Sequence, residues 1–526
     1  MIQSRIFAAV VALTISLPAL AAEEPAWTQT LERISSGVVS IRVDSTRAFD
    51  TEWNTSSQAT GFVVDAKRGL ILTNRHVVTP GPVIAEAVFR NNEEVELTPV
   101  YRDPVHDFGF FRYDPAELRY IEPVELPLAP GGAGIGKEIR VIGNDAGEQL
   151  SILAGTIARL DRKAPEYGRG KYNDFNTFYL QAASGTSGGS SGSPVVNIDG
   201  EVVALNAGAN SSAASSFFLP LDRVERALRK LQNDEPVTRG TLQTTFRSEP
   251  YDELRRLGLT EASETLARKR FPSQTGMLTV EQVIPGSPAA GVLSPGDILI
   301  NVNGELVTEF VPLAAILDNN VGQEIAVTVE RGGRRIDARI QVEDLHAITP
   351  DEYIEFGDGI VNQLSYQQAR HYNRPASGVY VANPGYLLSR AAVPRGSVII
   401  EMDGEPIANL DDFEAALAEL ADGERALVRY VTMENPQNPV VRLLEMDRTW
   451  FPSRRCARDD ALGVWPCHDL AAGPPPAAPE KGSTRLTKYS DPIVREIAPS
   501  LVVVTFDLPY TLSGVSDRHY YGTGLI

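Results

Sequence analysis

Three short stretches of this chain carry the residue types needed for nucleophilic catalysis. A glycine- and serine-rich stretch at residues 185–193 leads into an apolar run from Pro194, which predicts a tight loop before a β-hairpin. His76 follows the apolar residues 70–72, and Asp107 stands directly before another apolar run. A loop of this kind gathers backbone N–H groups around an exposed hydroxyl, as a serine nucleophile and its oxyanion hole require.

The candidate residues follow the order His76, Asp107, Ser191, which is one of the known orders for a catalytic triad. An imidazole titrates near neutral pH and can take the proton of a serine hydroxyl, while a carboxylate holds it in one tautomer. Asp103 and Asp114 are weaker alternatives for the carboxylate, because neither directly precedes the apolar run.

Three motifs together resemble those of the HtrA family of chymotrypsin-like serine proteases. The histidine motif of the family matches residues 73–78, and its aspartate motif matches residues 107–111. Its serine motif, Gly-Asn-Ser-Gly-Gly, matches residues 189–193 with departures at Ser190 and Ser193. The resemblance implies two six-stranded β-barrels with the triad in the cleft between them.

The serine motif has a second candidate. Ser187 fits the short pattern Gly-x-Ser-Gly-Gly better, but Ser191 has the spacing of the family to Pro194 and the following hairpin. We therefore expect Ser191 to be the nucleophile. The resemblance then assigns the oxyanion hole to the N–H groups of Gly189 and Ser191, and Ser193 in place of glycine leaves the local packing open.

The composition limits the class of protein. A chain of 526 residues is too long for a single core, so several domains are expected. The 43% content of hydrophobic residues is ordinary for a globular protein, and frequent glycine and proline favour β-structure with many turns. The formal net charge of −19 argues against nucleic acid and anionic membrane surfaces as partners.

Residues 1–21 have the pattern of a signal peptide. Arg5 supplies a positive start, residues 6–17 are apolar, and residues 19–21 form a small-residue cleavage site. We therefore expect an exported protein, periplasmic or secreted, from a bacterial envelope. No other run approaches the roughly 20 apolar residues of a spanning helix, so no membrane span is expected after removal of the signal.

The sequence predicts one disulfide and no metal site or cofactor. Cys456 and Cys467 are the two cysteines, and a nearby pair in an exported protein predicts a disulfide. The six histidines are scattered and no His-Glu-x-x-His motif occurs, which gives no support to a metalloenzyme. His106 is expected in a loop or on the surface.

We expect a trypsin-like protease domain over residues 22–235 and a first PDZ domain over residues 240–346. Residues 295–304 carry Pro-Gly-Asp-Ile-Leu-Ile-x-Val-Asn-Gly, which resembles the permuted PDZ domains of HtrA proteins. PDZ domains bind an extended peptide beside a sheet edge. The resemblance places the peptide contact at Leu257, Gly258 and Leu259. The alternative is that this domain only holds the protease in place.

A second and weaker PDZ copy is expected over residues 350–446. Residues 356–360 take the position of the peptide groove, which predicts peptide contacts at Gly359 and Ile360. The signature at residues 395–404 has lost its usual aspartate. A purely structural role for this domain is therefore an equal alternative.

The C-terminal part of the chain contains a linker and then a repeat. Residues 447–489 include the cysteine pair and a proline-rich run, which predicts a semi-rigid linker. Residues 490–526 repeat the start of the protease domain, since residues 38–41 correspond to residues 501–504 without a gap. The Thr-Gly pair at position 60 recurs at position 523 at the same separation.

The repeat predicts the first strands of a second protease-like barrel in a chain truncated at its C-terminus. This organisation is similar to the long tandem branch of the HtrA family, typified by a fungal nuclear protease linked to apoptosis. The overall expectation is a mainly β chain: a chymotrypsin-like double barrel, two α+β PDZ domains, and the start of a second barrel.

The expected function is an ATP-independent serine endopeptidase that cleaves unfolded or damaged proteins through an acyl-enzyme. The PDZ domains would bind peptide segments of those proteins. The alternative is a peptide-binding scaffold or chaperone that has lost catalytic competence. HtrA proteins are often trimers, but the oligomeric state stays open.

Overall fold

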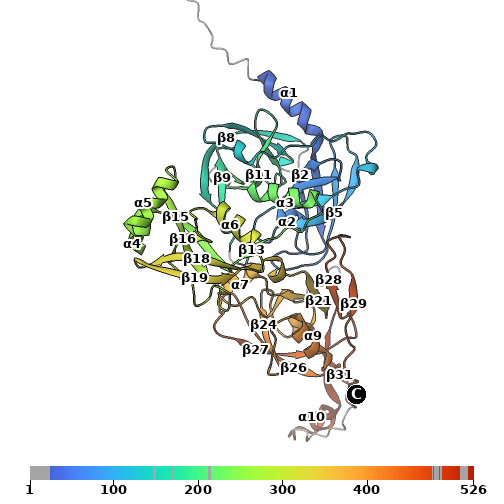
Figure 1. Cartoon of the computed structure of the whole chain (residues 1–526). Helices are drawn as coiled ribbons and strands as arrows, with labels where there is room; N and C mark the ends of the chain where they lie inside the picture. Colours follow the sequence, from blue (N-terminus) through green and yellow to red (C-terminus); the bar gives the residue numbers. More distant parts are fainter. Residues whose placement is uncertain are drawn as a thin grey trace, which may run out of the picture.

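The computed structural model describes residues 24–145, 150–168, 170–210, 215–476, 478, 485, 488–509 and 519–526. These residues form two closed β-barrels, then two smaller domains of sheet and helices, and a terminal hairpin (Figure 1). The predicted mainly β fold with a double barrel and two smaller domains is confirmed. The predicted signal peptide lies outside the described residues.

The first barrel closes through six strands with apolar inward side chains. In order around the barrel these are β1 (Val38–Ser45), β2 (Ser56–Asp65), β3 (Leu70–Thr73), β6 (Gly109–Arg112), β5 (Glu94–Arg102) and β4 (Val83–Val88). Ile41, Ile71 and Phe111 are fully buried in its interior, whereas Arg42 and Glu94 pair on its outer face. This alternation of inward and outward residues is what the period of a β-strand produces.

The second barrel has the same number of strands and is closed off by a helix. Its strands are β10 (Pro194–Val196), β11 (Val202–Asn210), β12 (Ser215–Leu219), β9 (Phe178–Ala182), β8 (Ser151–Lys163) and β7 (Glu138–Gly143). Helix α3 (Asp222–Gln232) follows, and it buries Val224, Ala227 and Leu228, which share one helical face. Helix α1 (Glu24–Ile34) precedes the first barrel but contacts the second, where Thr30 Oγ1 donates to the carbonyl of Ile198 at 2.7 Å.

The first smaller domain follows the barrels and extends over residues 240–344. Its sheet runs in the order β14 (Thr244–Pro250), β15 (Gly276–Val283), β16 (Ile298–Val302), β18 (Glu324–Arg331) and β19 (Arg334–Gln341), with β17 (Glu305–Leu306) on β16. Its helices are α4 (Tyr251–Leu257), α5 (Glu261–Arg270) and α6 (Phe310–Asn319). A short ladder of β13 (Gly240–Thr241) and β20 (Glu343–Asp344) joins the two ends of the domain. Strand β14 pairs only with β15, so it is an edge strand of the sheet.

The second smaller domain has a larger sheet. The strand order is β27 (Val440–Glu445), β26 (Arg425–Val431), β24 (Val398–Met402), β23 (Val379–Asn383), β22 (Gly359–Gln363), β21 (Glu352–Phe356), β28 (Arg454–Ala457) and β29 (Cys467–Asp469), with β25 (Glu405–Pro406) on β24. Its helices are α7 (Tyr366–Tyr372), α8 (Leu387–Arg390) and α9 (Leu410–Ala418). Cys456 and Cys467 form a disulfide between β28 and β29. Part of the predicted linker thus extends the sheet of this domain.

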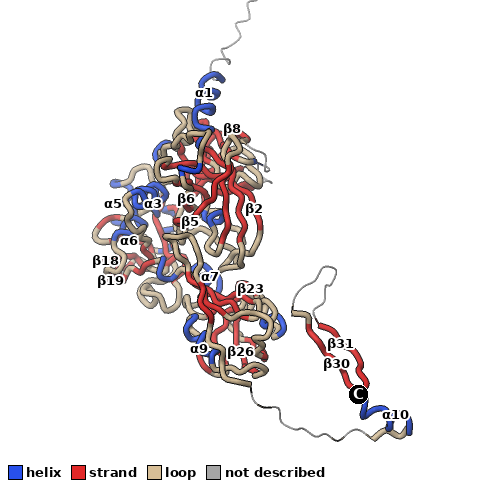
Figure 2. The backbone as a smooth tube through the Cα atoms, turned by 90° about the vertical axis from the view of Figure 1, so that its right-hand side faces the viewer, coloured by secondary structure: helices blue, strands red, loops and turns tan. Residues whose placement is uncertain are grey.

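The terminal hairpin repeats the register of the first one. After helix α10 (Pro492–Ile497), strands β30 (Leu501–Asp507) and β31 (His519–Leu525) pair with each other (Figure 2). The partners Leu501 and Leu525 correspond to Val38 and Phe62 in β1 and β2. Val503 in β30 remains 77% exposed, because no further strand of the described residues pairs with this hairpin.

Buried ion pairs fasten the first smaller domain to the protease barrels. The guanidinium of Arg239 lies 2.9 Å from a carboxylate oxygen of Asp103 and 2.9 Å from one of Asp318. All three side chains are almost fully buried. Burial alone would raise the pKa of Asp103, but the attraction of Arg239 outweighs it and holds that pKa below its usual range.

No helix of the described residues is long and apolar enough to cross a membrane.

We predict that Arg239→Ala destabilises the protein by about 3–5 kcal/mol, because it leaves the buried Asp103 carboxylate without its cation. Asp318 keeps its ion pair with Arg223 at 3.1 Å. Urea unfolding monitored by circular dichroism measures the change. Arg335→Ala is the matched control, since its pair with Asp337 is exposed on both sides and should contribute nothing measurable. Equal midpoints for the two variants would contradict the role of Arg239.

Candidate active site

His76 and Asp107 are joined directly. His76 lies in the short helix α2 (Arg75–Val78) after β3, and Asp107 lies in the loop before β6. The ring Nδ1 of His76 is 2.8 Å from Oδ2 and 3.0 Å from Oδ1 of Asp107, and the His76 backbone N–H donates to Oδ1 at 3.1 Å. Asn74 fixes the same loop by donating to the Asp107 carbonyl at 2.9 Å. Because the carboxylate accepts at Nδ1, that nitrogen carries the proton and Nε2 is left as the base.

The charges of this pair reinforce each other. Burial would lower the pKa of His76, but the negative charge and hydrogen bond of Asp107 outweigh it, and the pKa is raised above 6.5. Burial would raise the pKa of Asp107, but His76 holds it below its usual range. Asp107 therefore stays ionised beside the imidazole.

The loop that carries Ser191 is fixed to the first barrel by Thr60 in β2. The Thr60 N–H donates to the Ser191 carbonyl at 2.8 Å, and its hydroxyl donates to the Gly189 carbonyl at 2.9 Å. Thr73 at the end of β3 donates to the Thr60 carbonyl at 2.7 Å. Gly192 packs so tightly here that a Cβ would lie 2.1 Å from the Thr60 carbonyl and 2.2 Å from Thr73 Oγ1. The serine loop thus lies against the strand that leads into His76.

The backbone of this loop leaves two donors for an oxyanion. The neighbouring N–H groups of Ser190, Gly192 and Ser193 donate to backbone carbonyls. The N–H groups of Gly189 and Ser191 have no acceptor among the described residues. Gly189 has a φ of +96°, a left-handed conformation that glycine adopts without steric cost. Two free N–H groups beside a half-buried serine are the arrangement of an oxyanion hole.

The two serine candidates have different surroundings. The Ser187 hydroxyl donates to Oδ1 of Asp145 at 2.8 Å, and the Ser187 N–H donates to the same oxygen at 2.6 Å. Asp145 is partly exposed, and a carboxylate of this kind is a weaker base than the imidazole that activates a serine nucleophile. Ser191 forms no side-chain hydrogen bond among the described residues, and the contact of a serine with its base often tightens only on substrate binding.

Ser193 is accommodated by a glycine on another strand. Ser193 is fully buried, and a Cβ on Gly143 at the end of β7 would lie 2.0 Å from its hydroxyl oxygen. Glycine at position 143 therefore makes room for serine at position 193. The structure answers the packing question that this departure from the family motif raised in the sequence.

A second carboxyl stands behind Asp107. Oδ2 of Asp174 accepts from the Asp107 N–H at 3.1 Å and from the Tyr179 hydroxyl at 2.7 Å. Burial raises the pKa of Asp174 well above its usual range, and the charge of Asp107 raises it further. Asp174 therefore positions the backbone of Asp107, and its raised pKa favours the neutral form of this carboxyl. Sequence reasoning did not identify Asp174 or Thr60, although Thr60 belongs to the repeated Thr-Gly pair.

The alternative acids and the extra histidine have other contacts. Asp103 pairs with Arg239, as described above, and Asp114 caps a short turn by accepting the Ala116 N–H. His106 was expected in a loop or on the surface. It lies in the loop between β5 and β6 but is buried there, and burial lowers its pKa to about 4. No group of histidine, cysteine and acidic side chains among the described residues could hold a metal ion.

The residues predicted to bind peptide lie elsewhere than expected. Leu257 ends α4 and Gly258 is its left-handed cap, with φ +103° and a Cβ position only 2.4 Å from the Gly333 nitrogen. Leu259 is buried in the same hydrophobic cluster as Leu254 of α4. Gly359 and Ile360 begin β22, which is paired with β21 on one edge and β23 on the other. None of these five residues lies at a free sheet edge.

Comparisons with known proteins agree with this architecture. A family model described as trypsin-like peptidase domain matches residues 59–205, one described as PDZ domain matches residues 279–331, and one described as PDZ-like domain matches residues 347–423. The chain is 48% identical over 510 residues to pro-apoptotic serine protease nma111 of Aspergillus oryzae, covering 96% of this chain and 50% of that protein. It is 50% identical over 452 residues to Protease Do-like 7 of Arabidopsis thaliana, covering 84% of this chain and 41% of that protein.

Among solved structures, HtrA-type protease AlgW with tripeptide is 21% identical with a TM-score of 0.46, covering 60% of this chain and 97% of that one. The chain spans about half the length of the curated relatives it matches. Those relatives come from a fungus and a plant. The prediction of a periplasmic or secreted protein of the bacterial envelope is therefore wrong.

We predict that Thr60→Val lowers the free energy of unfolding by about 1–3 kcal/mol. The Asn144 N–H is buried and donates to the Thr60 hydroxyl at 2.9 Å, so valine leaves it without a partner. Thr523→Val is the control, because Thr523 is the counterpart of Thr60 in β31 and is exposed. An unchanged urea midpoint for Thr60→Val would contradict the anchoring role of this hydroxyl.

The pH titration of His76 tests the electrostatic coupling of the pair. We expect its imidazole to titrate above 6.5 in the wild type, because Asp107 stabilises the charged form. Asp107→Asn removes that charge while burial remains, so the pKa of His76 should fall. Histidine C–H resonances followed by NMR, with His76→Gln to assign the signal, measure both values. A pKa that does not move would show that Asp107 is not the partner.

Proposed function

We propose that this chain, which carries a trypsin-like peptidase domain with PDZ domains and is homologous to fungal pro-apoptotic serine proteases, is a serine endopeptidase of the HtrA type. The observation that carries the proposal is the direct pairing of His76 with the buried Asp107, next to a loop that offers a serine and two free N–H groups.

In the proposed reaction, Ser191 Oγ attacks the peptide carbonyl while Nε2 of His76 takes its proton. The N–H groups of Gly189 and Ser191 stabilise the negative oxygen of the tetrahedral intermediate. His76 then gives its proton to the leaving amine as the C–N bond breaks, which leaves an acyl-enzyme on Ser191. Water, deprotonated by the same imidazole, releases the acid and restores the serine. Asp107 stabilises the imidazolium in both halves of the reaction.

The substrates we propose are unfolded or damaged polypeptides. An extended chain can reach a serine between two barrels, whereas a folded loop rarely offers its main chain in that form. We propose domain limits at residues 22–235, 240–346 and 350–446, with residues 490–526 as the first strands of a second protease-like barrel. The shared register of the two hairpins supports that last assignment. The assembly state and the absence of nucleic-acid partners remain predictions from the sequence.

The second candidate function is a peptide-binding scaffold without activity. The departures from the family motif at Ser190 and Ser193 favour it. Both residues fit the site, however. The Ser190 hydroxyl donates to the Ser187 carbonyl at 2.6 Å, and Ser193 fills the space left by Gly143. These contacts support a loop that is held in shape for catalysis.

We predict that Ser191→Ala lowers the turnover of unfolded casein by roughly 10⁶-fold. Asp107→Asn should lower it by about 10⁴-fold, because the imidazole loses the partner that sets its tautomer. Ser187→Ala is the matched control and should keep the wild-type rate within a factor of a few. Cleavage is measured as the release of labelled fragments.

A fluorophosphonate probe with peptide mapping identifies the nucleophile directly. An adduct on Ser191 supports the proposed reaction. An adduct on Ser187 would move the nucleophile, and an unlabelled protein that does not cleave casein would favour the scaffold.

A further inference from the structure

Strand β14 presents backbone groups on the edge that faces the protease barrels. It is the last strand of its sheet, and β15 covers only its other edge. The carbonyl of Thr244 and the N–H of Phe246 both point to the uncovered edge, because each bonds a side chain there. Alternate residues of a strand share an edge, so the N–H and carbonyl of Ser248 lie on it too. An added strand would pair with these groups.

The side-chain amide of Asn176 occupies two of these positions. Asn176 lies in the loop before β9 of the second barrel. Its Nδ2 donates to the Thr244 carbonyl at 3.1 Å, and its Oδ1 accepts from the Phe246 N–H at 2.7 Å. A carboxamide offers the same donor and acceptor as a peptide group. Asn176 therefore makes the two main-chain hydrogen bonds that a bound peptide would make at this end of β14.

The space between β14 and helix α6 is closed by the same loop. Phe178 packs edge-to-face on Phe310, the first residue of α6, with ring centroids 4.9 Å apart. Between Phe246, Phe310 and Leu313 only about 30 Å³ of free volume remains. A peptide side chain could not enter without movement of the loop.

The equivalent edge of the second smaller domain is filled in a different way. Strand β22 holds the position in its sheet that β14 holds in the first. Its outer edge pairs with β21 over four residues, and Phe356 of β21 packs on Phe413 of helix α9 with ring centroids 5.4 Å apart. Strand β28 continues this sheet and the disulfide holds it. In the second domain a full strand, β21, thus pairs with this edge, whereas in the first domain the side chain of Asn176 bonds to it.

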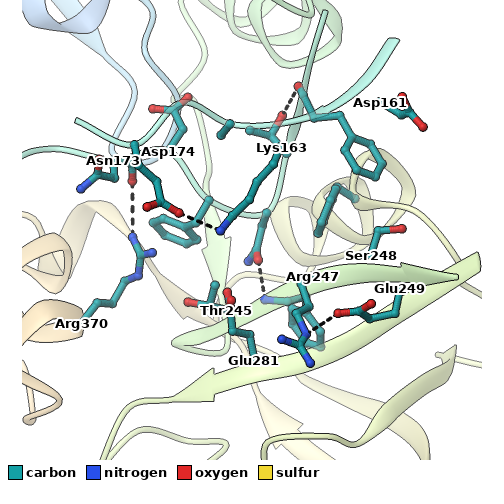
Figure 3. A pocket seen from close by; sticks show the side chains of 18 of the residues that line it. Asp161, Lys163, Asn173, Asp174, Thr245, Arg247, Ser248, Glu249, Glu281 and Arg370 are labelled. Carbon is teal, nitrogen blue, oxygen red and sulfur yellow. Dashed lines mark hydrogen bonds and ion pairs between the residues drawn. The ribbon is translucent and has the colours of Figure 1, made fainter. Parts of the chain in front are cut away.

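A cavity of about 680 Å³ continues along the uncovered part of β14 (Figure 3). Arg247, Ser248 and Glu249 of β14 line one wall, Lys163 of β8 lies opposite, and Arg370 of α7 lines a third side. Cations and anions alternate around it and pair with each other, as Arg247 does with Glu249 at 2.8 Å. The cavity therefore has room for an extended chain and no excess of either charge to select a charged one.

Two backbone donors near the start of β14 already have acceptors within the protein. The Gly240 N–H donates to Oδ1 of Asp318 at 3.0 Å, and the same carboxylate pairs with Arg239. The Gln243 N–H donates to the Thr241 hydroxyl at 2.8 Å. These two N–H groups are therefore not available to the terminal carboxylate of a bound peptide.

We propose that Asn176 is a built-in placeholder on the first PDZ domain, and that an internal extended polypeptide segment binds there by displacing it. The segment enters through the 680 Å³ cavity, pairs first with Ser248, and then takes the hydrogen bonds of Asn176 at Thr244 and Phe246. Recognition is through the main chain and needs no free C-terminus. This inference rests on the peptide-binding part of the proposed function and specifies its ligand and its competitor.

The test measures peptide affinity in the full chain carrying Ser191→Ala, so that the probe is not cut. The probe is a fluorescein-labelled ten-residue peptide of alternating valine and serine, prepared with a free and with an amidated C-terminus. Asn176→Ala should bind both forms about 10- to 30-fold more tightly by fluorescence anisotropy, because two net hydrogen bonds no longer compete. Asn438→Ala is the control, since this amide bonds only its own turn.

Hydrogen exchange keeps the test valid if Asn176→Ala alters folding. Residues 244–250 should exchange faster in Asn176→Ala, slow again with peptide, and leave the rest of the chain unchanged. Three results would each overturn the proposal. The first is equal affinity and equal exchange in the chains with and without Asn176→Ala, the second is no binding of peptide to either chain, and the third is binding of the free-acid peptide alone. Both chains in this assay carry Ser191→Ala, so the assay does not test peptidase activity. Casein cleavage by the chain with Ser191 tests that activity separately.

Discussion

The attraction between the buried Asp107 carboxylate and His76 is the interaction on which the rest of the site depends. A carboxylate inside a protein stays charged only if its surroundings replace water, and here the imidazole and the backbone of the same turn do so. The pairing fixes which ring nitrogen is protonated, and therefore which nitrogen can act as a base. The two barrels supply the other parts, because Thr60 of the first holds the serine loop of the second.

The loop that leads into β9 connects this site to both smaller domains. Asp174 bonds the backbone of Asp107, Asn176 bonds β14, and Phe175 packs edge-to-face on Tyr366 of α7 with ring centroids 5.5 Å apart. Within three residues, one segment therefore contacts the catalytic pair and two separate domains. A ligand that displaces Asn176 would act two residues from Asp174, which bonds the backbone of Asp107.

The sequence predicted those features of the fold and the site that depend on local motifs, and it did not predict those that depend on contacts between distant segments. The strand and loop patterns around Ser191 and His76 are local. The sequence therefore predicted the two barrels, and it named two residues, His76 and Asp107, that lie 2.8 Å apart in the structure. Residues 257–259 were expected to line a peptide groove, but Gly258 caps the C-terminus of α4. A glycine directly after a helical pattern is a known stop signal for a helix, so the sequence already contained this information. Asn176 could not be found, because nothing in its own segment indicates that it meets a strand about seventy residues away.

The most direct test of the account is a crystal structure of the chain with a peptide boronic acid. The account predicts a covalent bond from boron to Ser191 Oγ, one boronate oxygen within hydrogen-bonding distance of the N–H groups of Gly189 and Ser191, and Nε2 of His76 at the second. A bond to Ser187, or a boronate oxygen turned away from both N–H groups, would contradict it.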